Sequence, residues 1–294
     1  MIEIRRHNAA FCQECFCRHC REQVRRAIHD YGMLDPGDRV LVAVSGGKDS
    51  LALWDLLLDL DYAADGLYVG LGFGDYSDAS LGYARDFAAR RDARLLEIDV
   101  PGEYGFDIAG GAQAARRVPC SACGLSKRHL FNQAAIEGGY PAIATGHNLD
   151  DEAAVLFGNV LRWDTAYLGR QVPVLPASHG FAKKVKPLVR LGERETAAYC
   201  LLNAIDYIVE ECPMAVGNKH LGYKDALNRV EEQSPGSKAS FYFSFVDRVS
   251  AHFRPEAETE REGLHPCPGC ASPTTGELCA FCKLVIKATG GSPR

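Results

Sequence analysis

The feature that most constrains this fold is a short apolar strand that leads through a glycine turn into a helix. The strand is RVLVAV at 39–44, the turn is SGGKDS at 45–50, and the helix is expected over 51–60. Further apolar runs at 66–71, 94–100 and 141–145 alternate with helical stretches at 80–91, after Cys123, and from Asp150 to about Arg162. Such alternation is typical of a parallel sheet with helices on both faces. The sequence therefore predicts an α/β fold.

The rest of the chain predicts smaller units around this α/β core. Residues 163–187 are expected to form loop and an edge strand, and 192–203, 219–233 and 237–253 to form helices. A charged linker is expected at 256–262. We therefore expect four units along the 294 residues: a Cys/Arg-rich head at 1–24, the α/β domain at 25–215, a helical extension at 216–258 and a cysteine-containing segment at 264–285.

Composition excludes several classes of protein. With 47% apolar and 24% charged residues, the chain has enough material for a core and is not a disordered or coiled-coil protein. No apolar run approaches the length of a membrane span, and the N-terminus does not resemble a signal peptide, so a cytoplasmic location is expected. The net charge of −5 argues against a protein that coats nucleic acid by bulk charge.

The glycine turn has the properties of a phosphate-binding loop. Its glycines allow backbone N–H groups to approach phosphate oxygens, and the helix that follows contributes a partial positive charge. The loop also lies at the carboxyl end of a strand, where open α/β sheets bind their ligands. Its spacing is not that of a Walker A loop. The alternative is a Gly-Gly turn that only begins a helix.

The loop and a second segment resemble the PP-loop ATP pyrophosphatases. The second segment, TGHNLDDE at 145–152, again stands where a strand gives way to a helix. By itself it is also an Asp N-cap with a capping Glu, and the two interpretations are compatible. The resemblance implies the adenine nucleotide alpha hydrolase-like fold of that family. It also implies cleavage of ATP between the α- and β-phosphates, usually with transfer of AMP to an oxygen.

Three central cysteines indicate metal or sulfur chemistry. Of the 12 cysteines, Cys120 and Cys123 form a CxxC at the start of a helix, where thiols ionise easily, and Cys212 precedes a proline. Three thiolates suit an iron–sulfur cluster with one open iron, or a redox-active pair plus one further thiol. The alternative is three packed thiols. Cys200 lies in an apolar helical run and is expected to be a core residue.

The loop and these cysteines together resemble the TtuA/Ncs6 group of tRNA 2-thiouridine synthetases, most closely its bacterial TtuA branch. The matching blocks are 39–53, 120–128, 145–159, 210–213 and 273–282. The resemblance implies ATP-dependent adenylation of a uridine C2 oxygen in tRNA, followed by sulfur transfer through a [4Fe-4S] cluster with an open iron. It favours 5-methyluridine or uridine of the T-loop, with wobble-uridine 2-thiolation and 2-thiocytidine synthesis as alternatives.

The resemblance also implies roles for single residues. The cluster would be held by Cys120, Cys123 and Cys212, and catalysis would involve Asp49, Lys127 and Asp151. The implied ATP-binding residues are Ala43, Ser45, Gly46, Gly47, Lys48, Asp49, Ser50, Val69, Lys127, Gly146 and Asp151.

The implied cofactors are ATP, Mg²⁺, the [4Fe-4S] cluster and Zn²⁺. The implied partners are tRNA, a ubiquitin-like sulfur carrier that ends in Gly-Gly, and a second copy in a homodimer. A zinc-stabilised tRNA- or protein-binding module without catalysis is the alternative from a different class. The intact Asp49, Lys127 and Asp151 argue against it.

Two terminal groups of cysteines are candidate zinc sites. The C-terminal group has the spacing CxxC-x8-CxxC, which can close a tetrahedral Zn–S₄ site in a zinc ribbon. Its members are Cys267, Cys270, Cys279 and Cys282. The N-terminal group lacks the first CxxC that the resemblance leads us to expect, so it predicts a partial zinc finger. Its members are Cys12, Cys15, Cys17 and Cys20, of which the last two are alternatively packed residues of the first helix.

Several basic groups are candidate contacts for tRNA phosphates. The best placed is the pair Arg116 and Arg117, just before the central cysteines. The others lie at 25–26, 90–94 and 183–186.

Overall fold

The computed structural model describes residues 1–210, 212–214, 219–259 and 262–291. Its central sheet has the strand order β5-β4-β3-β6-β8-β7. All neighbouring strands are parallel except the edge pair β7 and β8, so the expected parallel sheet and edge strand are confirmed. In that order the strands are Leu95–Asp99, Ala63–Gly70, Arg39–Val44, Ala142–Thr145, Lys184–Val185 and Val174–Leu175.

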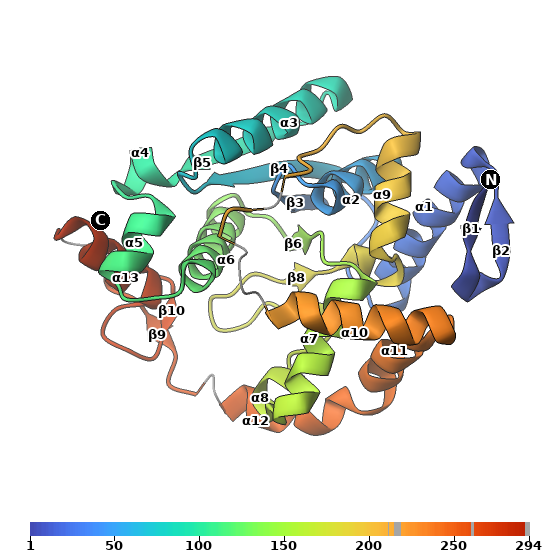
Figure 1. The fold of residues 1–294 in the computed structure, drawn as a ribbon. Coiled ribbons are helices and arrows are strands. Elements are labelled where there is room, and N and C mark those ends of the chain that lie inside the picture. The colour runs from blue at the N-terminus through green and yellow to red at the C-terminus, as the bar shows by residue number, and fades with distance from the viewer. Residues whose placement is uncertain (211, 215–218, 260–261, 292–294) are drawn as a thin grey trace.

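Helices cover both faces of this sheet because its central strand buries side chains on both sides. Val40, Val42 and Val44 of β3 join one core cluster, while Leu41 joins the other. The first cluster includes residues of α1 (Gln13–Asp30), α2 (Lys48–Asp59), α3 (Asp75–Arg91), α7 (Leu149–Arg162), α9 (Glu193–Leu202) and α11 (Ser237–Arg248). The second includes residues of α5 (Ile108–Ala114) and α6 (Pro119–Glu137). Figure 1 shows α5 and α6 on the left of the view and α1 and α9 on the right.

Connecting segments hold several short helices that the sequence pattern did not predict. Between β5 and α6 the chain forms α4 and α5, and between α7 and α9 it forms α8 and a 3-10 turn. Their bounds are Val100–Tyr104 for α4, Thr165–Leu168 for α8 and Pro187–Arg190 for the turn. Helices this short carry too little apolar periodicity to be recognised in a sequence.

The N-terminal head is a β-hairpin that leads directly into a long helix. Strands β1 (Ile2–Ile4) and β2 (Ala9–Phe11) pair in antiparallel fashion around the 3-10 turn Arg5–His7. Helix α1 then runs through residue 24, where we expected the head to end. No structural boundary therefore separates the head from the α/β domain at that position.

The C-terminal third packs against the α/β domain. Helix α10 (Lys219–Gln233) and α11 are followed by the 3-10 turn Ser250–Phe253 and α12 (Arg254–Thr259). The expected linker at 256–262 therefore begins inside a helix, and its residues 260–261 lie outside the described residues, as do 211 and 215–218. The last segment contains β9 (His265–Pro266), β10 (Pro273–Thr274) and α13 (Ala280–Thr289).

Helix α13 is part of the core. Its Phe281, Leu284 and Val285 belong to the same buried cluster as Leu41 of the central strand. Figure 1 shows this helix beside α5 and α6, at the opposite end of the molecule from the N-terminal hairpin. The described part of the chain contains no helix long and apolar enough to cross a membrane.

Candidate nucleotide and sulfur site

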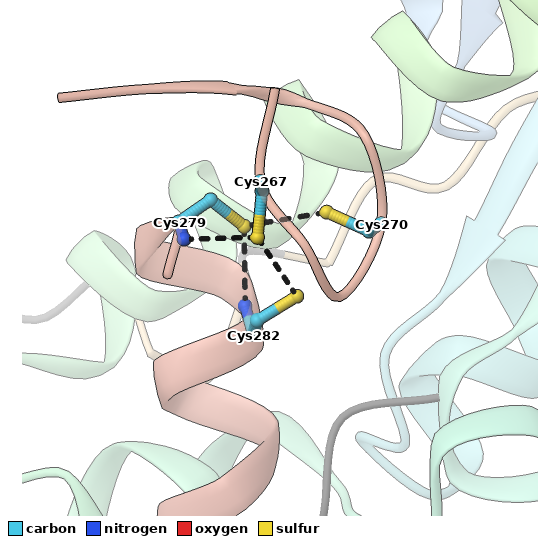
Figure 2. Close-up of side chains that lie close together, drawn as sticks. All are labelled: Cys267, Cys270, Cys279 and Cys282. Atoms are coloured by element: carbon cyan, nitrogen blue, oxygen red, sulfur yellow. Dashed lines mark hydrogen bonds between the residues drawn. The ribbon is translucent and has the colours of Figure 1, made fainter. Parts of the chain in front are cut away.

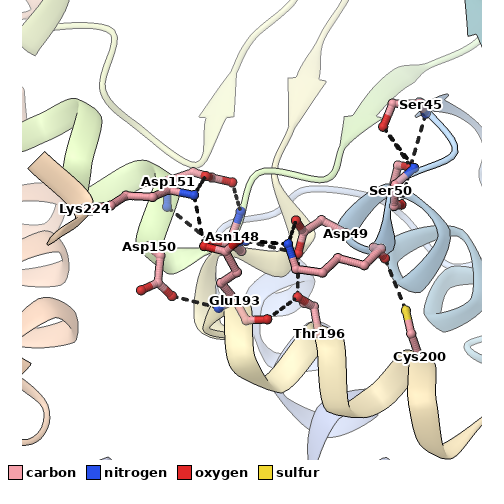
Figure 3. Close-up of polar contacts among 12 residues, drawn as sticks. Ser45, Asp49, Ser50, Asn148, Asp150, Asp151, Glu193, Thr196, Cys200 and Lys224 are labelled. Atoms are coloured by element: carbon pink, nitrogen blue, oxygen red, sulfur yellow. Dashed lines mark hydrogen bonds and ion pairs between the residues drawn. The ribbon is translucent and has the colours of Figure 1, made fainter. Parts of the chain in front are cut away.

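The SGGKDS turn forms a tight loop between β3 and α2. Gly46 has a φ of +73°, and a Cβ at this position would lie 2.2 Å from the backbone oxygen of Ser80. The Ser50 hydroxyl closes the loop by donating to the Gly47 carbonyl (2.8 Å) and accepting from the Ser45 N–H (3.1 Å). The loop is therefore fixed in a shape that leaves the first N–H groups of α2 at the carboxyl end of β3 (Figure 3).

Asp49 is held at the centre of the site by partners from three elements. Its Oδ1 accepts hydrogen bonds from Asn148 Nδ2 (3.1 Å) and Thr196 Oγ1 (2.5 Å), and Lys48 Nζ lies 3.1 Å from its Oδ2. Burial raises the pKa of the Asp49 carboxyl, the charge of Lys48 opposes this effect, and the charge of Asp151 adds to it. The two predicted catalytic aspartates therefore share one local electrostatic environment.

Asp151 both caps helix α7 and faces a lysine of α10. Its side chain accepts from the Asn148 N–H, and its own N–H donates to Asn148 Oδ1. The helix therefore begins with a capping box, but its N-cap is Asn148 and its reciprocal acid is Asp151, not the Asp and Glu that the sequence predicted. Its Oδ1 also lies 2.6 Å from Lys224 Nζ, which in turn lies 3.1 Å from Glu193 Oε2. Glu193 also pairs with Lys48 (2.8 Å).

Lys224 and Glu193 are site residues that the sequence analysis did not identify. They link the loop lysine to Asp151 through α9 and α10 (Figure 3). Neither lies in a motif, because each comes from a helix far along the chain. Only their spacing within predicted helices was available as a signal.

The residues expected to face adenosine lie at the carboxyl ends of neighbouring strands. Ala43 of β3 is in register with Thr145 of β6, and Val69 lies near the end of β4. Gly146 follows β6 so closely against the loop that a Cβ would lie 3.0 Å from the Asp49 carbonyl carbon and the Ser50 nitrogen. The structure therefore places all three beside the loop, as a nucleotide site requires.

The three central cysteines approach one another at the mouth of this site. Cys120 and Cys123 lie in the first turn of α6, and Cys120 Sγ donates to the carbonyl of Met214, two residues after Cys212. Burial raises the pKa of Cys123, Lys127 lowers it, and the nearby Cys212 and Cys120 thiols raise it further. The segment that leads to Cys212 is held beside the nucleotide loop, because the Ile208 N–H donates to the carbonyl of Gly46 (3.0 Å).

The arrangement of these three thiols fits a cluster better than a single ion. They are not among the groups whose ligand atoms all lie within 4.8 Å of one another. A cubane cluster holds its cysteines on separate irons and therefore further apart than one tetrahedral ion does. The thiols also differ in exposure, since Cys120 is exposed whereas Cys123 and Cys212 are partly buried. An accessible edge of this kind leaves room for substrate.

Lys127 projects from α6 one turn after Cys123. It is partly buried and makes no ion pair with any described residue. Its positive charge acts on Cys123 and lowers the pKa of that thiol. Lys127 is therefore a cation near the thiols that is free to meet an anionic group.

The C-terminal cysteines form a four-thiol group, as predicted from their spacing. Cys267 Sγ lies 3.9 Å from Cys282 Sγ, and Cys270 Sγ lies 3.5 Å from Cys279 Sγ (Figure 2). Burial opposes ionisation of Cys267, but N–H donors from Cys279 and Gly269 outweigh it and lower its pKa to about 7. Four converging sulfur atoms with N–H donors fit a structural Zn²⁺.

The N-terminal cysteines do not form such a group. Cys12 is the exposed N-cap residue of α1, and hydrogen bonds from the backbone N–H and the thiol of Cys15 lower its pKa, whereas Cys17 and Cys20 lie further along the same helix. Cys20 is fully buried in the core, where burial raises its pKa. A partial zinc finger at these cysteines stays a prediction, and the alternative of a packed helix residue describes Cys20. Cys200 is a core residue, as expected.

The predicted basic groups differ in their exposure to solvent. Arg116 and Arg117 are exposed in the turn between α5 and α6, immediately before Cys120. By contrast, Lys186 is buried against Glu152 (2.6 Å), and burial lowers the pKa of Lys184 to about 8. The candidate phosphate contact at 183–186 is therefore not a basic surface patch.

Comparisons with known proteins identify the family, although no protein-family model matches the chain. A tRNA-5-methyluridine(54) 2-sulfurtransferase of Thermus thermophilus is 49% identical over 96% of this chain and 87% of that protein. A protein of the same name from Pyrococcus horikoshii is 42% identical over 96% and 89%. The U34-tRNA thiolase NcsA from Methanococcus maripaludis, solved with its [4Fe-4S] cluster, shares the fold, with a TM-score of 0.79 and 24% identity over 97% and 92% of the two chains. The chain therefore belongs to the family of the tRNA-5-methyluridine(54) 2-sulfurtransferases.

Proposed function

We propose that this protein replaces the C2 oxygen of a T-loop 5-methyluridine in tRNA with sulfur, with ATP as the activating substrate. The names of the relatives support the reaction and the target. The observation that carries the proposal is the placement of Cys120, Cys123 and Cys212 beside a PP-loop, because thiolation requires oxygen activation and sulfur delivery at one place. Wobble-uridine 2-thiolation is the second candidate, favoured by the fold shared with the U34-tRNA thiolase.

The nucleotide site supplies the groups that adenylation needs. The uridine O2 attacks the α-phosphorus of ATP, and the bond to the bridging oxygen of the β-phosphate breaks, which releases pyrophosphate. The N–H groups at the start of α2 stabilise the departing charge. Lys127 neutralises charge that develops on the α-phosphate. Asp49 and Asp151 would hold Mg²⁺ through their carboxylate oxygens, and the ion would offset the charge of the phosphates.

The sulfur step takes place at the three thiols. A bound [4Fe-4S] cluster supplies an iron that no cysteine occupies, where a sulfur ligand can be held. Cys120, Cys123 and Cys212 would hold that cluster, with the exposed side of Cys120 toward tRNA. AMP then leaves the activated carbon as the carbon–sulfur bond forms, so the nucleoside exchanges oxygen for sulfur without a net change in oxidation state of carbon.

The partners follow from the same proposal. Arg116 and Arg117 stand next to Cys120 on an exposed turn and would contact tRNA phosphates. A structural Zn²⁺ would be held by the four C-terminal thiols. The family resemblance supports a ubiquitin-like sulfur carrier ending in Gly-Gly and a homodimer. A cytoplasmic location is consistent with accessible thiols that must stay reduced.

The experiment is a reconstituted reaction under anaerobic conditions. Protein with rebuilt cluster is mixed with tRNA that contains 5-methyluridine, ATP, Mg²⁺ and sulfide, and AMP and thiolated nucleoside are measured together. The proposal predicts equal amounts of both products. Asp49→Ala should abolish both, whereas Cys120→Ala should abolish the thiolated nucleoside. AMP without any thiolated nucleoside in the wild-type reaction would contradict the proposal.

A further inference from the structure

Two histidines and a buried glutamate converge where the N-terminal hairpin, α1 and α9 meet. His7 ends the 3-10 turn of the hairpin, His19 lies on α1, and Glu195 lies in the first turn of α9. Their ligand atoms all lie within 4.8 Å of one another. None of the three has a part in the nucleotide or sulfur site described above.

The two oxygens of Glu195 have different surroundings. Oε2 accepts from Arg6 Nη2 (2.5 Å) and from the Gly192 N–H (2.6 Å). Oε1 is buried and has no hydrogen-bond partner, and the same is true of His19 Nε2. These two atoms face each other across 3.6 Å, which is the distance of an ion pair when His19 is protonated but is too long for a hydrogen bond. The side chain of Glu195 is only 9% exposed, so water does not satisfy it freely.

The 3.6 Å between Glu195 Oε1 and His19 Nε2 is close to the distance between two ligands of one metal ion. Ligands at about 2.1 Å from a tetrahedral Zn²⁺ lie roughly 3.4 Å apart. With neutral His19, a buried carboxylate oxygen and an imidazole nitrogen that face each other without a hydrogen bond are costly to bury. Because Arg6 binds the opposite oxygen, it leaves Oε1 free to act as a single-oxygen ligand.

We propose that His7, His19 and Glu195 bind one Zn²⁺ ion. Two imidazole nitrogens and one carboxylate oxygen are a donor set that this ion prefers. Water is the fourth ligand, because His7 is exposed to solvent and leaves one side of the ion open. This site uses none of the four cysteines of the head.

The ion would fasten the head to the helix that supports the nucleotide loop. Glu195 stands two residues after Glu193, which pairs with Lys48, and one residue before Thr196, which donates to Asp49. An ion on Glu195 would therefore fix the first turn of α9, which carries two partners of the nucleotide loop. The inference concerns metal binding and stability and does not depend on the proposed reaction.

The test is the zinc content of the purified protein, measured by mass spectrometry of the metal after extensive dialysis. Wild-type protein should hold about two zinc ions per chain, one in the ribbon and one in the head. His7→Gln combined with His19→Gln should retain about one. Because His7 is exposed, the single substitution His7→Gln tests the same site with the packing of the helix intact. It should lower the affinity of the head for zinc by at least about tenfold.

The matched control is Cys12→Ser combined with Cys15→Ser, which removes two thiols from the same head. It should keep about two zinc ions. Bound Co²⁺ provides a second readout, since the ribbon gives thiolate charge-transfer absorption and the head site does not. One zinc ion in wild-type protein and in His7→Gln alike would overturn the proposal. Loss of the second ion from the cysteine variant but not from His7→Gln would also overturn it.

Discussion

Lys224 Nζ lies 2.6 Å from Asp151 Oδ1, although the two residues belong to different helices and only Asp151 lies in a recognisable motif. The same ammonium group reaches Glu193 at 3.1 Å, and Glu193 reaches Lys48 of the nucleotide loop. The side chain of Lys224 is 21% exposed, so its charge is weakly screened. The loop, α7, α9 and α10 are thus joined by one network of charges.

Removal of the Lys224 charge should impair adenylation. We expect Lys224→Ala to lower tRNA-dependent pyrophosphate release by about 10²-fold, because Asp151 loses the cation that orients it. The activity of Lys224→Arg should fall between those of Lys224→Ala and the wild type, since this substitution keeps the charge and changes the geometry. Arg229→Ala, on an exposed position of the same helix, is the matched control. Equal activity of Lys224→Ala and Arg229→Ala would contradict a role for this lysine.

Two glycine substitutions should have opposite effects on the stability of the fold. Gly46→Ala places a Cβ 2.2 Å from the Ser80 carbonyl oxygen at a positive φ, so it should abolish ATP binding, as measured by calorimetry, and lower the melting temperature. Gly82→Ala has open space around its Cβ inside α3 and should raise the free energy of unfolding by about 0.5–1 kcal/mol. Unchanged ATP affinity in Gly46→Ala would show that the loop does not bind phosphate in this shape.

The ion pairs of Glu193 predict a pH dependence of stability. Burial opposes ionisation, but Lys48 and Lys224 outweigh it and lower the pKa of Glu193 from 4.5 to about 2. A carboxylate with a lowered pKa stabilises the fold above its unfolded pKa and loses that effect as pH falls toward the folded value. The stability difference between wild type and Glu193→Gln should therefore be full above about pH 5 and shrink toward pH 3, as measured by urea unfolding.

An exposed carboxylate in another part of the chain serves as the control for this titration. Glu277→Gln removes one charge from an exposed position of the C-terminal segment. Its stability should follow that of the wild type at every pH. A constant difference between Glu193→Gln and wild type from pH 7 to about pH 3 would exclude the ion pairs as its cause.

Loss of zinc from the ribbon should destabilise the whole protein. The thiols Cys267, Cys279 and Cys282 belong to the same buried cluster as β3, so the site and the sheet share a core. Structural zinc sites contribute on the order of 10 kcal/mol of apparent binding free energy. Cys270→Ala should therefore lose the ribbon zinc and melt at a clearly lower temperature. His265→Gln, in the same segment but outside the four-thiol group, should melt as wild type does.

Much of the fold was predictable because its signals are local. The strand at 39–44, the glycine turn and the helix after it are adjacent in sequence, and apolar continuity marks buried parallel strands. The short helices α4 and α8 were not predictable, since they hold less than two turns of periodic pattern. The sequence also did not predict that α13 packs into the core, because four cysteines in a short segment suggest an independent unit.

The candidate site was predictable where motifs carry it and not elsewhere. Asp49 and Asp151 stand in two motifs that both begin at the end of a strand, so their proximity follows from the sheet. Lys224 and the trio around Glu195 depend on contacts between segments far apart in the chain. The zinc site at the head cysteines stays a prediction, because spacing alone does not show that Cys15, Cys17 and Cys20 lie on one continuous helix.

Position-resolved mass spectrometry of tRNA nucleosides tests the central claim most directly. Cells that lack the gene are complemented with the wild-type protein, with Cys120→Ala, or with Cys17→Ala as a cysteine control outside the site. We predict 2-thio-5-methyluridine at the T-loop position with wild type and Cys17→Ala, and none in the deletion strain or with Cys120→Ala. Thiolation that persists in the deletion strain, or that Cys120→Ala restores, would contradict the assignment of the reaction to this protein and its three central thiols.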